Sequence, residues 1–584
     1  MRLEDYWGIG PKTRDRLAES IGEAAAIEAI ENGDVRTLTD AGLSGGRATR
    51  ILRHAGGGAA LDVLATRDGR NVYKELLDTI SSYAVTDRAA DTIRIMTPLE
   101  STAEIEERLD TVFEAVESWQ SLPEHEREAV IEVFDSYDER GGRRATVETA
   151  LELRALGVEN GIFEPVAALD TDTLEEASRA LAGLESNGTG VGEGADDRLD
   201  DLRRQLGAVE DLAATPDSVL ESVQSGAREA AQLREELTRY LAGETGLDLA
   251  RVRDAVPGEA TDARGFVGET LRALADELRE AVDEREQAVA AAFEETLAEA
   301  DDGIEAAVSA VEDIAFAVSL ARFTVAFDLT RPAFASDRVS AVVNARNLFL
   351  DAAGESVQPI TYAVGEHGLD VAASRNPPTA HRVAVLTGAN SGGKTTLLET
   401  LCQVQLLAQM GLPVPADQAE VTLVERIVFH RRHASFNAGV LESTLRSVVP
   451  PLTESGRTLM LVDEFEAITE PGSAADLLHG LVRLTVDHDA MGVFVTHLAD
   501  DLEPLPNEAR TDGIFAEGLT PSLELEVDYQ PRFESVGRST PEFIVSRLVA
   551  NAGEPAERAG YETLAQAVGE QAVQRTLADA RWTE

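Results

Sequence analysis

The stretch from Val383 to Leu398 constrains the fold of this chain more than any other. It contains an apolar run, a glycine-rich turn and a sequence suited to a helix start, and from Gly388 to Thr395 it fits the pattern G-x-x-x-x-G-K-T. This order predicts a strand, a phosphate-binding loop and a helix whose N-terminus faces the bound anion. The residues expected to hold the nucleotide are Gly388, Ala389, Asn390, Ser391, Gly392, Gly393, Lys394, Thr395 and Thr396.

The use of lysine supports a functional loop. Of the 52 basic residues only Lys12, Lys74 and Lys394 are lysines. A compact ammonium on a flexible stem suits the β- and γ-phosphates better than a guanidinium fork, which explains why the loop keeps a lysine. We expect Lys394 to contact the phosphates and Thr395 to ligate Mg²⁺.

Two further apolar runs end in polar residues of the kind that phosphoryl transfer needs. The run from Thr458 ends in Asp463 and Glu464, and the run from Gly492 ends in Thr496 and His497. We expect Asp463 to join Thr395 at the metal and Glu464 to orient or deprotonate the attacking water. His497 is expected to sense the γ-phosphate, although a lone histidine is more often a satisfied residue at a strand end.

The composition indicates the environment in which the protein works. The 584 residues carry 52 basic and 106 acidic side chains, a net charge of -54, with 5% aromatic residues. Acidic residues spread through the chain favour a halophilic, cytoplasmic protein in concentrated salt over a locally acidic, chaperone-like one. There is no apolar run long enough for a membrane helix, and the single cysteine, Cys402, is expected in the core.

Residues 1–54 are an exception, with 8 basic and 9 acidic residues and a local net charge of -1. Gly8-Ile9-Gly10-Pro11 and the weaker copy at Gly42-Leu43-Ser44 resemble helix-hairpin-helix elements, whose backbone N–H groups hold phosphates without reading bases. The alternative is a small helical protein-binding domain. The residues expected to contact DNA are Gly8, Ile9, Gly10, Lys12, Arg14, Gly42, Ser44 and Arg47.

The pattern of the whole chain predicts a multidomain protein. A small all-α helix-hairpin-helix domain occupies residues 1–58, with a hinge expected at Gly56–Gly58. Residues 71–330 are rich in Ala, Glu, Leu and Arg at helical spacing and predict a long-helix core and lever domain. Residues 331–584 alternate apolar runs with helices, as an α/β nucleotide-binding domain does.

With these residues in view, about Asn71 to Leu548 resembles the MutS family of DNA mismatch-repair ATPases. Thr387–Thr396 is similar to its T-G-P-N-M-G-G-K-S-T loop, with Ala389 in place of proline. Leu461–Phe465 is similar to its Walker B strand, Thr496–His497 to its switch histidine, and Gly537–Thr540 to its closing G-x-S segment. A helix could begin just after Ser443, where the hydroxyl and the free N–H groups of a helix N-terminus would suit a γ-phosphate. Leu441–Leu445 is similar to the family's motif that crosses a dimer, which implies that Ser443 completes the partner's ATP site.

The resemblance implies an ABC-class ATPase domain that uses ATP and Mg²⁺ and works as a homodimer with composite ATP sites. The family's N-terminal mismatch-reading domain is missing, and the loop after Walker B, Glu466–Gly472, departs from the family pattern. The chain therefore resembles an archaeal member of the second, MutS2-like branch. That implies an ATP-hydrolysing protein that binds duplex or branched DNA independently of sequence, in recombination or repair. The alternatives are a mismatch-recognition repair protein and a non-catalytic DNA tether that uses ATP to lock a dimer.

Overall fold

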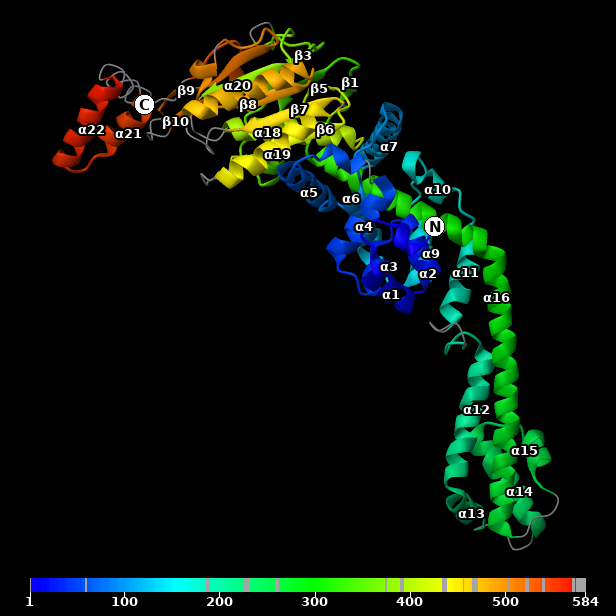
Figure 1. Cartoon of the computed structure of the whole chain (residues 1–584). Coiled ribbons are helices and arrows are strands. Elements are labelled where there is room, and N and C mark those ends of the chain that lie inside the picture. The colour runs from blue at the N-terminus through cyan, green and yellow to red at the C-terminus, as the bar shows by residue number, and fades with distance from the viewer. Residues whose placement is uncertain are drawn as a thin grey trace. The chain divides into compact units, whose positions relative to one another are not determined.

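The computed structural model describes residues 2–57, 60–184, 190–224, 230–257, 262–372, 375–388, 393–432, 438–454, 456–464, 471–502, 504–519, 525–537, 541–569 and 573. The chain divides into two compact units. The first unit comprises Met1–Arg127 and Ile314–Glu584, and the second comprises Glu128–Asp313. No helix within the described ranges is long and apolar enough to cross a membrane. Figure 1 shows the elements of both units.

The N-terminal elements of the first unit share a small core of their own. They are η1 (Leu3–Asp5), α1 (Pro11–Ser20), α2 (Glu23–Glu31), α3 (Val35–Asp40) and α4 (Gly45–Gly57). Leu3, Leu17, Leu38 and Ile51 are almost completely buried there. The hinge expected at Gly56–Gly58 is wrong for its first two residues, because α4 continues through Gly57. Glycine weakens a helix by about 1 kcal/mol but does not end it when the preceding turn is packed. Gly58 lies outside the described residues.

The helical region from residue 67 to 326 confirms the expected long-helix pattern. Its elements are α5 (Arg67–Ser81), α6 (Asp87–Ile95), α7 (Thr102–Ser121), α8 (Glu124–Ser136), α9 (Gly142–Ala155), α10 (Glu164–Ala167), α11 (Thr171–Gly183), α12 (Asp197–Ala214), α13 (Pro216–Gln224), α14 (Ala230–Thr245), α15 (Leu249–Ala255) and α16 (Ala263–Ala326). In the second unit, α16 runs beside α12 and α14 (Figure 1), and their apolar sides form one core. Leu271, Leu274 and Leu278 of α16 belong to it, at the helical spacing seen in the sequence.

A six-stranded sheet forms the centre of the first unit, in the order β10-β9-β4-β8-β7-β6. The strands from β9 to β6 are parallel, and β10 is antiparallel to β9. The elements are β4 (Val383–Gly388), α18 (Gly393–Gln409), β6 (Arg426–His430), α19 (Ala438–Thr453), β7 (Thr458–Asp463), α20 (Pro471–Asp487), β8 (Met491–Val495), η5 (Ala499–Leu502), β9 (Ala509–Leu519), β10 (Leu525–Arg532), α21 (Pro541–Asn551) and α22 (Pro555–Val568).

Both faces of this sheet are covered, which explains why its strands read as continuous apolar runs. Ala384 and Leu386 of β4 face a core shared with α18 and α5, whereas Val383 and Val385 face a core shared with α19 and α20. Figure 1 shows α18 and α19 along the sheet in yellow. The chain thus holds the start of α18 against the carboxyl end of β4.

A smaller sheet has the order β1-β5-β2-β3. Its elements are β1 (Ala333–Phe334), β2 (Val339–Ala345), α17 (Leu348–Ala352), β3 (Ile360–Gly365) and β5 (Gln418–Val421). The segment before α5 is bound to the edge of the large sheet, because Thr66 Oγ1 donates to the Phe429 carbonyl at 2.6 Å and accepts from the Phe429 N–H. Residues of α5 and the end of α16, such as Leu76 and Phe323, therefore share the core of the first unit.

Candidate nucleotide-binding and catalytic site

The candidate site lies at the carboxyl ends of β4, β7 and β8. These strands end at Gly388, Asp463 and Val495, and β8 lies between the other two. Parallel strands present the residues that follow them along one edge of the sheet. The three motifs singled out in the sequence, although far apart in the chain, are brought together for this reason.

The described part of the phosphate loop is shaped by glycine. Gly388 has a φ of +133°, and a Cβ there would lie 2.2 Å from the carbonyl oxygen of Ile514. A side chain at Gly393 would lie 2.2 Å from the ring of Tyr529. Lys394 is buried, and its Nζ donates to the Gly388 carbonyl at 2.9 Å, across the loop. The predicted ligands Ala389, Asn390, Ser391 and Gly392 lie outside the described residues.

Thr395 and Asp463 form the pair expected to hold a metal ion. Thr395 Oγ1 donates to Asp463 Oδ2 at 2.6 Å. The other carboxylate oxygen, Oδ1, is buried and has no hydrogen-bond partner among the described residues. Burial raises the pKa of Asp463 because it penalises the charged form. A buried carboxylate oxygen without a partner, beside a hydroxyl at the end of a phosphate loop, fits a hard divalent cation such as Mg²⁺.

Glu464 is held in an uncommon backbone conformation, with a φ of 42°. Its N–H donates to the Val495 carbonyl at 3.0 Å, which ties it to β8. Glu464 Oε1 lies 2.8 Å from His497 Nε2, and this contact holds the pKa of Glu464 below its usual range. The two residues predicted to act at the γ-phosphate are therefore in direct contact, and Glu464 stays ionised as a water-orienting base must.

Arg432 is a site residue that sequence reasoning missed. It follows the end of β6, the neighbour of β7, and its Nη1 contacts Glu464 Oε2. The Glu464 carboxylate is thus bound on one oxygen by His497 and on the other by Arg432. A charged residue just after a buried parallel strand was the available signal, but the sequence does not reveal that β6 is next to β7.

A pocket of about 330 Å³ adjoins the first turn of α18. Its lining includes Asn347, Gln358, Thr396, Leu397 and Tyr529. Gln358 is fixed between the Tyr529 N–H, from which its Oε1 accepts at 3.0 Å, and Asp528, to which its Nε2 donates at 2.7 Å. The pocket combines an aromatic ring with amide groups next to Gly393, and its size suits a small ligand. Neither Tyr529 nor Asn347 was found from the sequence, because they are remote from α18 in the chain.

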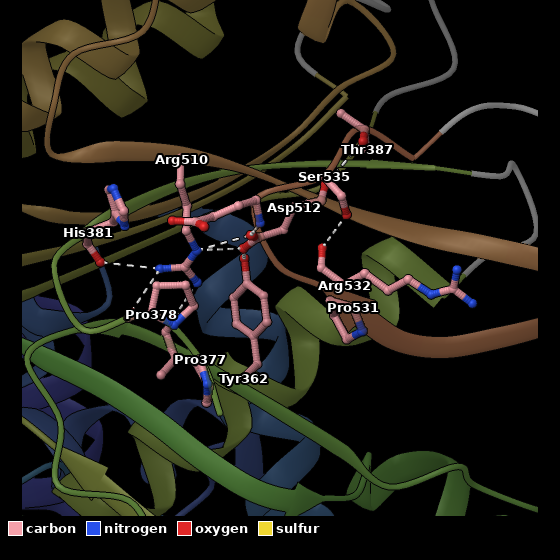
Figure 2. Close-up of polar contacts among 12 residues, drawn as sticks. Tyr362, Pro377, Pro378, His381, Thr387, Arg510, Asp512, Pro531, Arg532 and Ser535 are labelled. Carbon is pink, nitrogen blue, oxygen red and sulfur yellow. Dashed lines mark hydrogen bonds and ion pairs between the residues drawn. The ribbon is translucent and has the colours of Figure 1, made fainter. Parts of the chain in front are cut away.

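A buried polar network lies behind the phosphate loop (Figure 2). Arg510 and Asp512 have side-chain exposures of 2% and 0%. Arg510 Nε donates to both oxygens of Asp512 at 3.0 Å, and the hydroxyl of Tyr362 donates to Asp512 Oδ2 at 2.9 Å. Arg510 Nη2 also donates to the Ala363 carbonyl at 2.6 Å. The network joins β9 of the large sheet to β3 of the small one.

The same network reaches the loop itself. Thr387 Oγ1 donates to the Asp512 carbonyl at 3.0 Å and accepts from the Gly537 N–H at 2.6 Å. The Glu534 N–H donates to Asp512 Oδ1 at 3.1 Å. Thr387 immediately precedes Gly388, so the segment from 534 to 537 is attached beneath the phosphate loop. Gly537 is the first residue of Gly537–Thr540, the predicted closing segment, and residues 538–540 lie outside the described residues.

Ser443 is not at a helix start, which corrects the reason first given for its phosphate contact. The helix α19 begins at Ala438, so Ser443 lies in its second turn and is exposed there. The sequence Glu442-Ser443-Thr444 looks like a cap, but helical structure already covers the preceding residues. No free N–H groups of a helix N-terminus are available at that point.

The residues expected to contact DNA lie together at two tight turns. Gly8 and Gly42 have φ values of +79° and +91°, which glycine adopts without strain. Arg47 Nη2 donates to the Gly8 carbonyl at 3.2 Å, so part of this guanidinium already binds within the domain. Arg14 is paired with Glu4 and Asp15. The other residues of this predicted set, Ile9, Gly10, Lys12 and Ser44, lie in or next to the same turns, with Lys12 exposed.

The part of the chain that holds this site is similar to known proteins. Residues 384–507 match the protein family described as MutS domain V. The chain is 44% identical over 209 residues to the DNA-binding protein MutS2 of Pyrococcus furiosus, covering 35% of each chain. It is 31% identical over 156 residues to an endonuclease MutS2 of Thermomicrobium roseum, covering 26% of this chain and 18% of that protein. A DNA mismatch repair protein MutS of Chloroflexus aurantiacus is 31% identical over 124 residues, which are 20% of this chain and 13% of that protein.

These similarities cover a limited part of each protein. The chain matches about a third of the length of the Pyrococcus relative and less of the other two. The MutS domain V match includes nearly all of β4 and the whole of β6, β7 and β8, and therefore Lys394, Thr395, Asp463, Glu464 and His497. The pocket residues Asn347, Gln358 and Tyr529 lie outside it. The similarity thus supports a MutS-family, MutS2-like chain, and it does so through the part that holds Lys394, Asp463 and Glu464.

Proposed function

We propose that this chain, whose residues 384–507 match MutS domain V, is a MutS2-like protein that hydrolyses ATP and binds DNA. The observation that carries the ATPase proposal is the assembly of Lys394, Thr395, Asp463 and Glu464 at one sheet edge, with one buried oxygen of Asp463 left without a partner. That oxygen has no structural use among the described residues, whereas a nucleotide-bound cation would satisfy it. ATP is the substrate in this proposal.

Each residue then has a distinct task. Lys394, at the start of α18, binds the β- and γ-phosphates, and its present bond to the Gly388 carbonyl keeps the ammonium over the loop. Thr395 and Asp463 would hold Mg²⁺, which neutralises charge that develops on the phosphates. Glu464 orients the attacking water and accepts its proton, and His497 fixes the Glu464 carboxylate. The pocket beside Tyr529 is positioned to take the base of the nucleotide.

DNA binding is the second half of the proposal. It rests on the similarity to the DNA-binding protein MutS2 of Pyrococcus furiosus and on the two turns at Gly8 and Gly42. Backbone N–H groups at such turns contact phosphates without reading bases, so binding is expected to be independent of sequence and to include duplex and branched DNA. We also propose that the ATP-bound form is a homodimer in which Ser443, exposed on α19, faces the partner's site.

Two substitutions test the ATPase proposal. Glu464→Gln should bind ATP like the unaltered protein and lose turnover by about 100-fold or more, because general-base catalysis contributes roughly 10²–10⁴-fold. Lys394→Ala should instead weaken ATP binding itself. Binding of a fluorescent ATP analogue and phosphate release, both in molar KCl, separate the two effects. Glu562→Gln, which removes an equal charge from the surface of α22, is the matched control.

The same variant tests the dimer. With hydrolysis blocked, Glu464→Gln should accumulate as a dimer in ATP and revert to the monomer when ATP is removed, as measured by sedimentation velocity. Turnover in Glu464→Gln like that of the control would overturn the catalytic assignment. Loss of turnover without an ATP-dependent dimer would leave the ATPase assignment in place and reject the composite site.

A further inference from the structure

Trp7 is an unusually exposed aromatic residue for its position. Its exposed fraction is 53%, whereas its neighbours Tyr6 and Ile9 are buried. The indole lies against the ring of His54, with ring centroids 3.8 Å apart and an angle of 23° between the planes. One face of the indole is thus supported by His54 of α4, and much of the remainder stays in contact with solvent.

The position of Trp7 is fixed from both sides. The hydroxyl of Tyr6 donates to Glu31 Oε1 at 2.8 Å and ties the preceding residue to α2. The following residue, Gly8, adopts a φ of +79°, and a Cβ there would sit 3.4 Å from Ile51 of α4. An aromatic ring that is held flat on a partner ring has little conformational entropy left to lose when a third ring stacks on it.

Two basic residues lie on the helices that carry or follow this stack, in the part of the chain that is least acidic. Arg50 lies one helical turn before His54 on α4 and is exposed, and Lys12 is exposed in the first turn of α1. Residues 1–54 carry a net charge of -1 (8 basic against 9 acidic), whereas the full chain carries -54. A negatively charged ligand with flat, apolar rings is the chemistry that matches this surface, and single-stranded DNA has both properties.

We propose that the Trp7–His54 stack is a platform for an unpaired DNA base, so that the N-terminal module binds junctions, ends or single-stranded arms in preference to continuous duplex. This rests on the proposed DNA binding and narrows its substrate class. Base stacking tolerates any sequence because every base has a flat face. It also survives concentrated salt, which weakens contacts to phosphate by a log–log slope of about -0.9 per contact on duplex DNA.

The test uses the full chain in molar KCl and two DNA probes that share one duplex. The first probe is fully paired, and the second carries an unpaired arm at a fork. Trp7→Ala should lower affinity for the forked probe by roughly 5- to 150-fold, the range found when a stacking aromatic is removed. Its affinity for the paired probe should change less than about threefold. Trp7→Phe keeps a ring and should retain most of the preference for the fork.

Two controls keep the result specific. Leu249→Ala removes an exposed apolar side chain from the second unit and should leave both affinities unchanged. The forked probe should also quench tryptophan fluorescence more in the unaltered protein than in Trp7→Phe. Both proteins keep Trp119, which is buried, and Trp582, which lies outside the described residues, so the difference between them reports Trp7. Thermal melting of each variant checks that the fold is kept, which is expected for a side chain that is half exposed.

The outcomes separate this proposal from the one on which it rests. Equal loss for both probes, or no loss for either, would overturn the base platform, and the second result would favour a protein-binding use of Trp7. If the unaltered chain bound neither probe, the proposed DNA binding itself would fail. A loss confined to the forked probe, with the ring-keeping variant active, would establish the platform.

Discussion

Asp463 and Glu464 are consecutive carboxylates whose surroundings move their pKa values in opposite directions. Burial raises the pKa of Asp463, whereas the contact with His497 lowers that of Glu464. The difference arises because Asp463 ends β7 inside the sheet edge, while the φ of 42° at Glu464 turns the next side chain towards β8. The sequence predicted two carboxylates after a buried strand. It could not show their different environments, which depend on β8 and β6 as neighbours.

Arg432 binds one oxygen of the Glu464 carboxylate. Because its guanidinium contacts the Glu464 oxygen that His497 leaves free, Arg432→Ala should release that oxygen to orient water. We expect basal ATP turnover to rise by about 1.4- to fivefold, which matches the roughly 0.2–1 kcal/mol of an ion pair whose arginine is largely exposed. The measurement is phosphate release at saturating ATP.

Arg432→Lys is the matched control for that prediction. It keeps the charge and loses the planar fork, so turnover should lie between the values for the unaltered protein and Arg432→Ala. A fall in turnover for Arg432→Ala, with ATP affinity unchanged, would contradict a restraining role and indicate that Arg432 assists the chemistry instead.

Among the elements, those closest to the phosphate loop were the most predictable. The strands β4, β7 and β8 are apolar runs that end in polar residues, and α18 starts after the glycine-rich turn, as expected. The predicted start of α19 was wrong. Ser443 resembles a helix cap, but the helix begins at Ala438. Pairing of strands distant in the chain, which places Tyr529 beside Gly393, leaves no local pattern in the sequence.

The buried Arg510–Asp512 ion pair connects two strands of different sheets. It lies within β9 and connects to β3 through Tyr362 and Ala363. Asp512→Leu should lower the free energy of unfolding by about 3–5 kcal/mol, because it leaves the buried Arg510 charge uncompensated. Urea denaturation followed by circular dichroism measures the effect.

The double variant distinguishes a missing partner from lost packing. Replacing both residues, as Arg510→Met with Asp512→Leu, removes the charge together with its counterion and should recover at least half of the lost stability. The two single substitutions and the double one form a cycle that isolates the pair. Additive losses would show that Arg510 and Asp512 act independently, contrary to the geometry of Figure 2.

The whole molecule folds into two compact units, and the domain boundaries expected near residues 71 and 330 stay predictions. Met1–Arg127 and Ile314–Glu584 form one unit, although the sequence shows a change of pattern near residue 330. Helical periodicity identifies α5 and α16 as helices but does not say which core they enter. Leu76, Phe323 and Leu401 share one core, and this long-range packing decides the boundary.

The buried core of the N-terminal module is drawn from its own residues, between Leu3 and Leu52, while Ile95 of α6 packs against it and Arg53 Nε donates to the Arg94 carbonyl. Removal of the module therefore tests where DNA binds, with thermal melting as the check that the rest of the chain stays folded. A chain that starts at residue 60 should keep basal ATP turnover within about twofold, because the module contributes nothing to the sheet edge with Lys394 and Asp463. The same chain should lose most of its affinity for DNA in molar KCl. Phosphate release and fluorescence anisotropy measure the two properties.

The reason for the expected loss is electrostatic. A protein with a net charge of -54 repels DNA at long range, and concentrated salt reduces the screening length to about 3 Å, so binding depends on short-range contacts. Residues 1–54 supply these from the two glycine turns in a segment of net charge -1 (8 basic against 9 acidic). A control chain with Arg36→Ala, which removes a basic side chain paired with the exposed Asp87 of α6, should bind DNA normally. If the truncated chain bound DNA as tightly as the full one, DNA would instead lie along the helical region, and the module would serve a protein partner.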